Sequence, residues 1–370
     1  MPISAVDCVQ PAIQHTRDQL FRPFRFGQWS RLALVGILAA ELHAGGCNFN
    51  GFNFPLSSHP RKGHEFAATS FPHPHFDPSQ IAQFAGLIIA IFLLAFILFF
   101  IFLYISSVFR FILFDSVLKK RCSISEGWHR WHRAGRRYFL WQIVFLIAEF
   151  LFLGVLIGVP LAVAAALGWF NDLQQHVGRT VLGVILLFGL FLVFVLVAIV
   201  VQLLAKDFLV PIMALEEVDF ADGWSRLLTL MRPEPGKYAV YLLLKIVLGI
   251  AAAILFGILA LIPTLVFIVP AVVAVIAGHA AGLGWNVTTV SLAIILGTVL
   301  MVLLIYVIAL VNVPATVFFP AFSIYFFAAR YPRLDALLNP PPPAPELPPV
   351  LQPPPPPEAP PLPPSPEPIG

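Results

Sequence analysis

The sequence predicts an all-α integral membrane protein with six transmembrane helices, internal repeats and interfacial amphipathic elbow helices. Hydrophobic residues make up 59% of the 370-residue chain and charged residues only 11%, whereas soluble domains carry about 25% charged residues. Several apolar runs exceed the ~20 residues that cross a hydrocarbon core of about 30 Å. These runs are continuous rather than alternating, which excludes a transmembrane barrel. Finally, the polar segments between the runs repeat a short motif.

The repeated motif pairs a tryptophan with an arginine two residues later. It is clearest at Gly223–Arg226 (Gly-Trp-Ser-Arg), recurs at Gly127–Arg130 (Gly-Trp-His-Arg) and is fainter at Gly27–Arg31 (Gly-Gln-Trp-Ser-Arg). After each copy the chain enters an apolar run, either at once or after a further basic stretch. We therefore expect a repeated unit of membrane helix, cytoplasmic elbow and membrane helix.

In chain order, residues 1–30 are expected to form a polar, arginine-containing cytoplasmic N-terminal arm. A membrane domain is expected over residues 31–338, with spans at about 31–44, 81–110, 138–167, 180–205, 238–277 and 290–319. The first span is short and has Trp29 as its interfacial anchor. The fifth is interrupted by Pro263 and Pro270, which predict a kinked helix because proline breaks the helical hydrogen-bond ladder. Whether this helix crosses once or re-enters the membrane is left open.

The distribution of basic residues predicts the orientation. Of the 22 Lys and Arg, only Arg61, Lys62 and Arg179 fall in the predicted outer loops. Lys245 lies inside a span, and all the others fall in the arm, the elbows and the C-terminal end of the membrane domain. Since cytoplasmic loops carry the excess of Lys and Arg, we expect a multi-pass protein of the cell inner (plasma) membrane with both termini in the cytoplasm.

The first elbow, residues 115–137, is expected to lie in the membrane interface. Ser123 and Glu126 fit a capping box that would begin a helix, and Trp128 and Trp131 then share one face. Trp and Arg at headgroup depth are typical of interfacial and lipid contacts. The expected interfacial or lipid-binding residues are Trp128, Arg130, Arg133, Arg136, Arg137, Trp224 and Arg226. The same cations also set the topology, and both interpretations stay open.

Four segments carry a family resemblance. Asp207–Met213 (Asp-Phe-Leu-Val-Pro-Ile-Met), Pro320–Phe327 (Pro-Ala-Phe-Ser-Ile-Tyr-Phe-Phe), Phe21–Leu32 and Asn48–Pro55 resemble an uncharacterised family of multi-pass bacterial and archaeal integral membrane proteins, over roughly residues 10–335. More distantly, the layout is similar to the membrane domain of glycerophosphodiester phosphodiesterases, whose soluble catalytic barrel has no counterpart here. The resemblance implies the membrane architecture and lends no catalytic residue.

Charged residues inside spans are the main candidates for function, because they are costly in a bilayer. Glu149 and Lys245 are these residues, as a structural ion pair or as part of a proton or transport path. His73 and His75 are candidate metal ligands in the outer loop, but their spacing fits no zinc module, so no metal is expected. The sequence has no phosphate-binding Gly-rich loop, zinc-protease motif or nucleophile elbow. We expect no catalytic residue, no cofactor and no enzymatic activity.

Residues 339–370 form a separate proline-rich cytoplasmic tail without Lys or Arg. Such a segment is disordered or extended as polyproline II, and is expected to be a spacer or a docking strip for a protein partner. The preferred function is a non-enzymatic scaffold, assembly factor or accessory membrane protein. The alternative is a small transporter or lipid-handling protein that uses Glu149 and Lys245, and a lipid hydrolase ranks third. We expect membrane lipids, including anionic ones, as partners and no nucleic acid.

Overall fold

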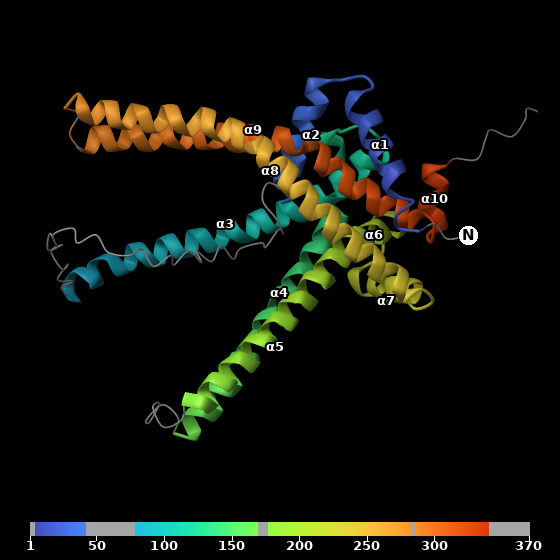
Figure 1. Cartoon of the computed structure of the whole chain (residues 1–370), viewed down its shortest axis with the longest axis horizontal. Coiled ribbons are helices and arrows are strands. Elements are labelled where there is room, and N and C mark those ends of the chain that lie inside the picture. Colours follow the sequence, from blue (N-terminus) through green and yellow to red (C-terminus); the bar gives the residue numbers. More distant parts are fainter. Residues whose placement is uncertain (1–3, 42–77, 169–176, 283, 285, 340–370) are drawn as a thin grey trace, which may run out of the picture.

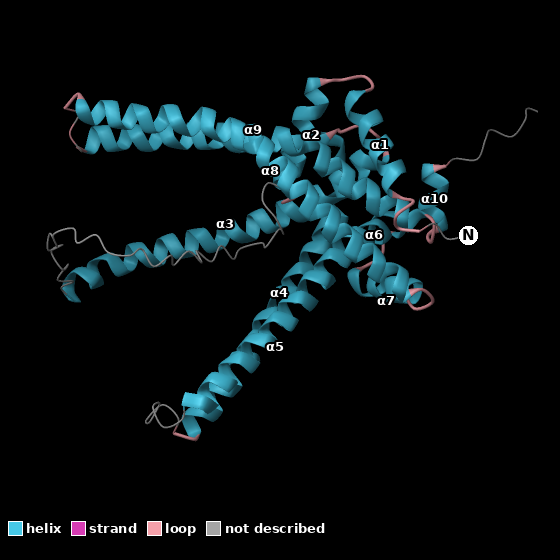
Figure 2. Cartoon of the chain, viewed as in Figure 1, coloured by secondary structure: helices cyan, strands magenta, loops and turns pink. Residues whose placement is uncertain are grey.

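The computed structural model describes residues 4–41, 78–168, 177–282, 284 and 286–339. The described part of the chain is helical and contains no β-strand (Figure 2). Its elements are α1 (Val9–Phe21), α2 (Phe26–Leu38), α3 (Pro78–Leu118), α4 (Ile124–Ala166), α5 (Val177–Leu204), the π-helix η1 (Ala205–Leu209), α6 (Val210–Glu216), α7 (Phe220–Met231), α8 (Pro235–Ala280), α9 (Val287–Ala328) and α10 (Pro332–Leu338).

Three long helical extensions leave one packed hub (Figure 1). The hub comprises α1, α2, η1, α6, α7 and α10 with the adjoining ends of the long helices, about residues 104–118, 124–145, 200–204, 235–248 and 304–328. The extensions are the remainder of α3, the hairpin of α4 with α5, and the hairpin of α8 with α9. Nearly all the buried side chains belong to the hub, whereas apolar side chains of the extensions are largely exposed. The chain therefore packs at one end of its long helices.

Within the described residues, five helical segments are long and apolar enough to cross a membrane: Ala85–Leu118, Ile124–Ala166, Thr180–Glu216, Pro235–Ala280 and Val287–Ala328. The all-helical class and the membrane character are thus confirmed, but the expected count of six spans is not. The predicted first span, 31–44, corresponds to α2, which has only 13 residues. At 1.5 Å per residue this is about 20 Å, too short for a hydrocarbon core of about 30 Å. Helix α2 instead packs against α9 and α3 in the hub.

Two further expectations about helix boundaries change. Helix α4 runs unbroken for 43 residues from Ile124. It therefore contains both most of the predicted elbow 115–137 and the predicted span 138–167 up to Ala166. Its expected N-cap, Ser123, occupies that position without a side-chain capping hydrogen bond. The predicted 238–277 helix is likewise one continuous helix, α8, with Pro263 and Pro270 inside it and no re-entrant break.

Aromatic side chains form the centre of the hub. Tyr241 lies 4.5 Å from Phe326 and 5.1 Å from both Phe208 and Phe322 between ring centroids. All four residues are fully buried. Aromatic pairs at these separations add about 0.5–1.5 kcal/mol each beyond the area they bury. The cluster therefore fixes η1, α8 and α9 together at one end.

The two clear copies of the repeated motif pack in the same manner. A Cβ built on Gly127 would lie 3.1 Å from Ile112 on the preceding helix α3, and a Cβ on Gly223 would lie 2.6 Å from Leu209 of η1. In each copy the missing side chain lets the elbow helix approach the end of the helix before it. The motif glycines thus allow the two elbow helices to pack tightly against the hub.

The N-terminal arm is part of this core through His15. Its Nε2–H donates to the Val117 carbonyl at 2.9 Å, so Nδ1 is the acceptor for the Tyr325 hydroxyl, 3.2 Å away. Burial lowers the pKa of His15 despite the bond to Val117, which keeps the imidazole neutral. Helix α1 is therefore fixed against α3 and α9.

Candidate functional site

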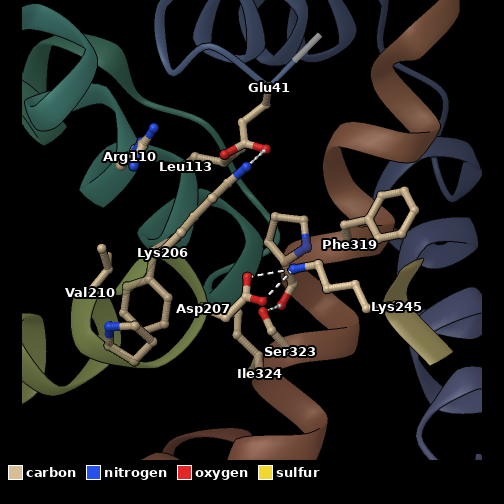
Figure 3. A pocket seen from close by; sticks show the side chains of 13 residues that line it. Glu41, Arg110, Leu113, Lys206, Asp207, Val210, Lys245, Phe319, Ser323 and Ile324 are labelled. Atoms are coloured by element: carbon tan, nitrogen blue, oxygen red, sulfur yellow. Dashed lines mark hydrogen bonds and ion pairs between the residues drawn. The ribbon is translucent and has the colours of Figure 1, made fainter. Parts of the chain in front are cut away.

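A cavity of about 50 Å³ lies in the hub, and five charged side chains line it: Glu41, Arg110, Lys206, Asp207 and Lys245 (Figure 3). They come from the end of α2, from α3, from η1 and from α8. The rest of the wall is mostly apolar, and Ser323 of α9 adds a hydroxyl group. Space of about 10–15 Å³ suffices for one ordered water, so the cavity has room for several waters or one small ion.

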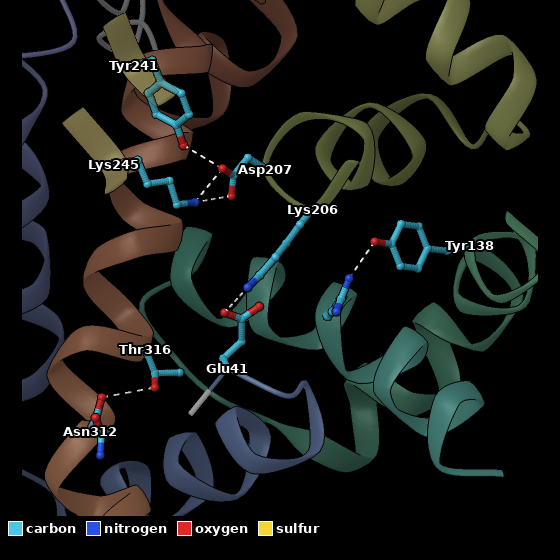
Figure 4. A network of polar contacts seen from close by, with 9 residues as sticks. Glu41, Tyr138, Lys206, Asp207, Tyr241, Lys245, Asn312 and Thr316 are labelled. Atoms are coloured by element: carbon cyan, nitrogen blue, oxygen red, sulfur yellow. Dashed lines mark hydrogen bonds and ion pairs between the residues drawn. The ribbon is translucent and has the colours of Figure 1, made fainter. Parts of the chain in front are cut away.

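Asp207 is the centre of one buried polar group. Lys245 lies 2.5 Å from each of its carboxylate oxygens, and the Tyr241 hydroxyl donates to Oδ2 at 2.9 Å (Figure 4). The Asp207 and Lys245 side chains are only 4% and 12% exposed. A buried ion pair with further hydrogen bonds can offset its desolvation. This pair therefore joins η1 to α8 within the hub.

Glu41 forms the second ion pair, with Lys206. Helix α2 ends in a Schellman motif in which Ala40 is left-handed (φ 56°), and the Glu41 N–H donates to the Gly36 carbonyl at 2.8 Å. This turn folds the chain back and sets the Glu41 carboxylate, 3% exposed, at the cavity. Glu41 therefore lies inside the hub, beside the cavity, and pairs with Lys206 there.

The π-helix η1 separates two consecutive charges. Lys206 extends toward Glu41, and the next residue, Asp207, meets Lys245 (Figure 4). Pro211 lies four residues after Asp207 and has no N–H to donate to the Asp207 carbonyl, so the α-helical ladder is interrupted here. Single-turn π-helices are frequent at functional sites. The local widening thus lets adjacent residues serve two different ion pairs.

Arg110 contributes a third cation to the cavity. Its Nη1 donates to the Tyr138 hydroxyl at 2.7 Å, and the residue is 9% exposed. Its Nε–H is buried and meets no hydrogen-bond acceptor in the described part of the chain. The site therefore contains a buried guanidinium with unused donor capacity.

The predicted intramembrane charges do not meet. Lys245 pairs with Asp207, while Glu149 lies half-buried on α4 in the second extension, outside the residues that line the hub cavity. The other proposed ligands, His73 and His75, fall outside the described residues. Of the two predicted charges, only Lys245 belongs to the candidate site.

The predicted interfacial tryptophans are half-buried against the hub. Trp128 packs beside Phe109, 6.0 Å between ring centroids, and Trp224 lies 6.1 Å from Trp141. Trp131, on the same predicted face as Trp128, is buried. In the structure this face contacts the hub core, which gives the elbows an internal packing role.

The predicted basic residues divide into two groups. Arg137 pairs with Asp219 at 3.1 Å and Arg226 pairs with Glu216, so both are tied to the segment between α6 and α7. Arg130, Arg133 and Arg136 are exposed on one part of α4, where Arg130 also lies over the Trp131 ring at 5.0 Å. These three residues remain the predicted lipid-facing cations.

Sequence reasoning missed most of the cavity. Arg110 and Lys206 entered the prediction only as basic residues that set the topology, and Asp207 only as part of the segment Asp207–Met213 that resembles the family. One signal was present: Arg110 and Lys206 stand at the same distance before the motif glycines Gly127 and Gly223. Aligning the two copies would have placed both cations at equivalent helix ends.

The family of the chain follows from a comparison with family models. The model described as Family of unknown function (DUF7544) matches residues 3–337. The chain belongs to the DUF7544 family. No curated protein and no solved structure gives a significant match. The resemblance to an uncharacterised family is therefore confirmed for this DUF7544 chain, whereas the more distant likeness to the phosphodiesterase membrane domain has no match behind it.

Proposed function

We propose that this DUF7544 protein is a non-enzymatic scaffold, assembly or accessory protein of the cell inner (plasma) membrane. The observation that supports this most strongly is the confinement of packing to the hub. Beyond the hub, α3 has no other described helix along its length, and the two hairpins lead away from it (Figure 1). Such separate apolar helices offer lateral surface to helices of another membrane protein.

The charges support placing the hub at the cytoplasmic face. Both described ends of the chain, α1 and α10, belong to the hub, and so does the basic start of α4. Under the positive-inside rule, this puts the hub at the cytoplasmic surface and the distal tips of the extensions across the bilayer. The proline-rich tail, whose residues 340–370 lie outside the described part, would then extend into the cytoplasm as a docking segment.

The transporter alternative has less support. A transport path near Glu149 needs helices packed around a polar channel, because charged groups in membranes line cavities or pair with one another. Glu149 lies in an extension whose outer residues, such as Phe150 and Leu151, are 67% and 66% exposed. The described cavity that holds charges lies instead in the hub. Lipid handling at that cavity remains compatible with an accessory role.

The proposed function can be tested on the isolated part of α3. A photoreactive residue would be placed in turn at each position from Leu87 to Leu94, where the described apolar side chains are exposed. After illumination in native membranes, we expect protein adducts of one discrete mass that recur every three to four positions, because one face of a helix would bind the partner.

Leu337 on α10 serves as the matched control, since it is 55% exposed but belongs to the hub. The photoreactive residue at Leu337 should not give the same adduct. Labelling of lipid alone, or equal protein labelling at every α3 position, would contradict a specific partner for this helix.

A further inference from the structure

We propose that the hub cavity is a binding site for a phosphate oxyanion, carried by an anionic lipid headgroup or by free inorganic phosphate. The site is built from Arg110, Lys206 and Lys245, with Glu41 and Asp207 as their internal counter-ions. This inference does not depend on the proposed scaffold role. It assigns a ligand class to a cavity that the accessory function leaves unused.

The charges around the cavity do not balance. Among the described residues that line it, three cations face two carboxylates, and the two ion pairs use Lys206 with Glu41 and Lys245 with Asp207. Arg110 is the remaining cation, and its only hydrogen-bond partner in the described chain is the neutral Tyr138 hydroxyl. Arg110 shares the attraction of Glu41 and Asp207 with the two lysines and has no carboxylate of its own within ion-pair distance in the described chain, which leaves one excess buried positive charge. A bound anion would supply the missing negative charge.

The geometry of Arg110 favours an oxyanion. A guanidinium carries five N–H donors in a planar fork, and here one donor on Nη1 is engaged by Tyr138 at 2.7 Å while Nε–H is unused. Tyr138 is fully buried, so it holds the guanidinium in one orientation. Arginine forks match phosphate oxygens in a bidentate manner. Arg110 is thus pre-oriented at the cavity wall with donors left over.

Lys206 adds a second donor from the equivalent place in the other repeat unit. It stands as far before Gly223 as Arg110 stands before Gly127, and both side chains line the same cavity (Figure 3). An ammonium has three donors, so its ion pair with Glu41 leaves capacity for another acceptor. The Lys206 side chain is 26% exposed, which gives the cavity contact with its surroundings.

The depth of the cavity fits a headgroup. Lys206 directly follows the apolar run that ends with Leu204 and Ala205, and Arg110 is the first charged residue of α3 after the uncharged stretch 81–109. Cations at the ends of membrane helices lie where lipid phosphates lie. A free phosphate ion from the aqueous side would meet the same donors, so the ligand chemistry is shared by both sources.

The test compares full-length wild-type protein with Arg110→Gln, Arg110→Lys and the control Arg232→Gln, at an exposed arginine outside both the cavity and the predicted lipid-facing set. Binding of inorganic phosphate is titrated in detergent at constant ionic strength with chloride as the balancing anion. Binding of lipid is measured in nanodiscs of phosphatidylcholine with or without phosphatidylglycerol. We expect Arg110→Gln to lower the affinity for the phosphate group by about tenfold or more, because one charge-assisted hydrogen-bonding partner is lost. Arg232→Gln should bind like the wild type.

The two arms identify the source. If only the binding of phosphatidylglycerol depends on Arg110, the ligand is a lipid headgroup. If the binding of phosphate in detergent also depends on Arg110, the free ion is a ligand as well. If Arg110→Gln does not fold, Arg110→Lys keeps the charge but loses the planar fork, and it should bind more weakly than the wild type. The proposal is overturned if Arg110→Lys binds as tightly as the wild type, if Arg232→Gln loses as much affinity as Arg110→Gln, or if neither probe binds.

Discussion

Replacing Asp207 by asparagine should lower the free energy of unfolding by about 3–5 kcal/mol, the cost of removing one partner from a buried ion pair. The substitution keeps the size of the side chain but leaves the Lys245 ammonium, 12% exposed, without its carboxylate. It also weakens the acceptor of the Tyr241 hydroxyl. Chemical denaturation of the purified protein in detergent would measure the loss.

Two comparisons make the Asp207 result specific. Asp115→Asn removes a more exposed pair with Lys119, four residues later at the C-terminal end of α3, and such i,i+4 pairs contribute only about 0.3–0.5 kcal/mol. The double variant Asp207→Met with Lys245→Met should regain much of the loss, because replacing both members of a buried pair by apolar groups is often neutral. A single variant as stable as Asp115→Asn would show that the pair does not hold the hub together.

Gly135→Ala should disrupt the contact between α3 and α4. A Cβ at this position would lie 2.6 Å from Val108 Cγ2 and 2.8 Å from Val108 Cα, so the backbone of one helix must move. Overpacking of this kind costs about 1–3 kcal/mol, and sometimes more. The added methyl group should therefore lower the thermal unfolding midpoint of the protein.

Gly154→Ala is the matched control on the same helix. Nothing lies within 4 Å of a Cβ at Gly154, and alanine is favoured over glycine in a helix by about 1 kcal/mol. This variant should be neutral or more stable. Equal destabilisation by both substitutions would mean that close approach at Gly135 is not what closes the hub.

The helical membrane class could be predicted because it depends on composition and on the length of apolar runs. The runs around Ile97, Phe188 and Leu296 are long and uncharged, and each lies in a membrane-length helix. The start of α4 could also be predicted from the sequence, because Ser123 stands at the predicted helix start. These are local properties of the chain.

The predicted first span, 31–44, has no membrane-length helix among its described residues. An apolar run of about 10–14 residues fits a buried core helix as well as a short crossing. Tertiary packing against α9 and the left-handed turn at Ala40 decide the case for α2. Neither the contact nor the turn conformation is visible in a run such as Leu32–Leu42, because alanine rarely adopts positive φ.

The cavity was hidden for the same reason. The two members of each ion pair are far apart in sequence and meet only where the helices converge in the hub. These pairs are Glu41 with Lys206 and Asp207 with Lys245. The sequence indicates Lys245 as an intramembrane charge, but the ion pair considered for it was with Glu149, because their two helices occupy equivalent places in the repeat. Pairing across helices depends on their rotation and offset, which apolar periodicity in an almost wholly apolar helix does not define.

The central claim is that one packed hub lies on one side of the membrane while the three extensions cross to the other. It is tested by impermeant maleimide labelling of Leu337→Cys in the hub and Gly284→Cys between α8 and α9, after Cys8, Cys47 and Cys122 are replaced by serine. Both chosen positions are exposed. In right-side-out vesicles Gly284→Cys should be labelled and Leu337→Cys protected, with the reverse in inverted vesicles. Labelling of both cysteines from the same side would contradict the account.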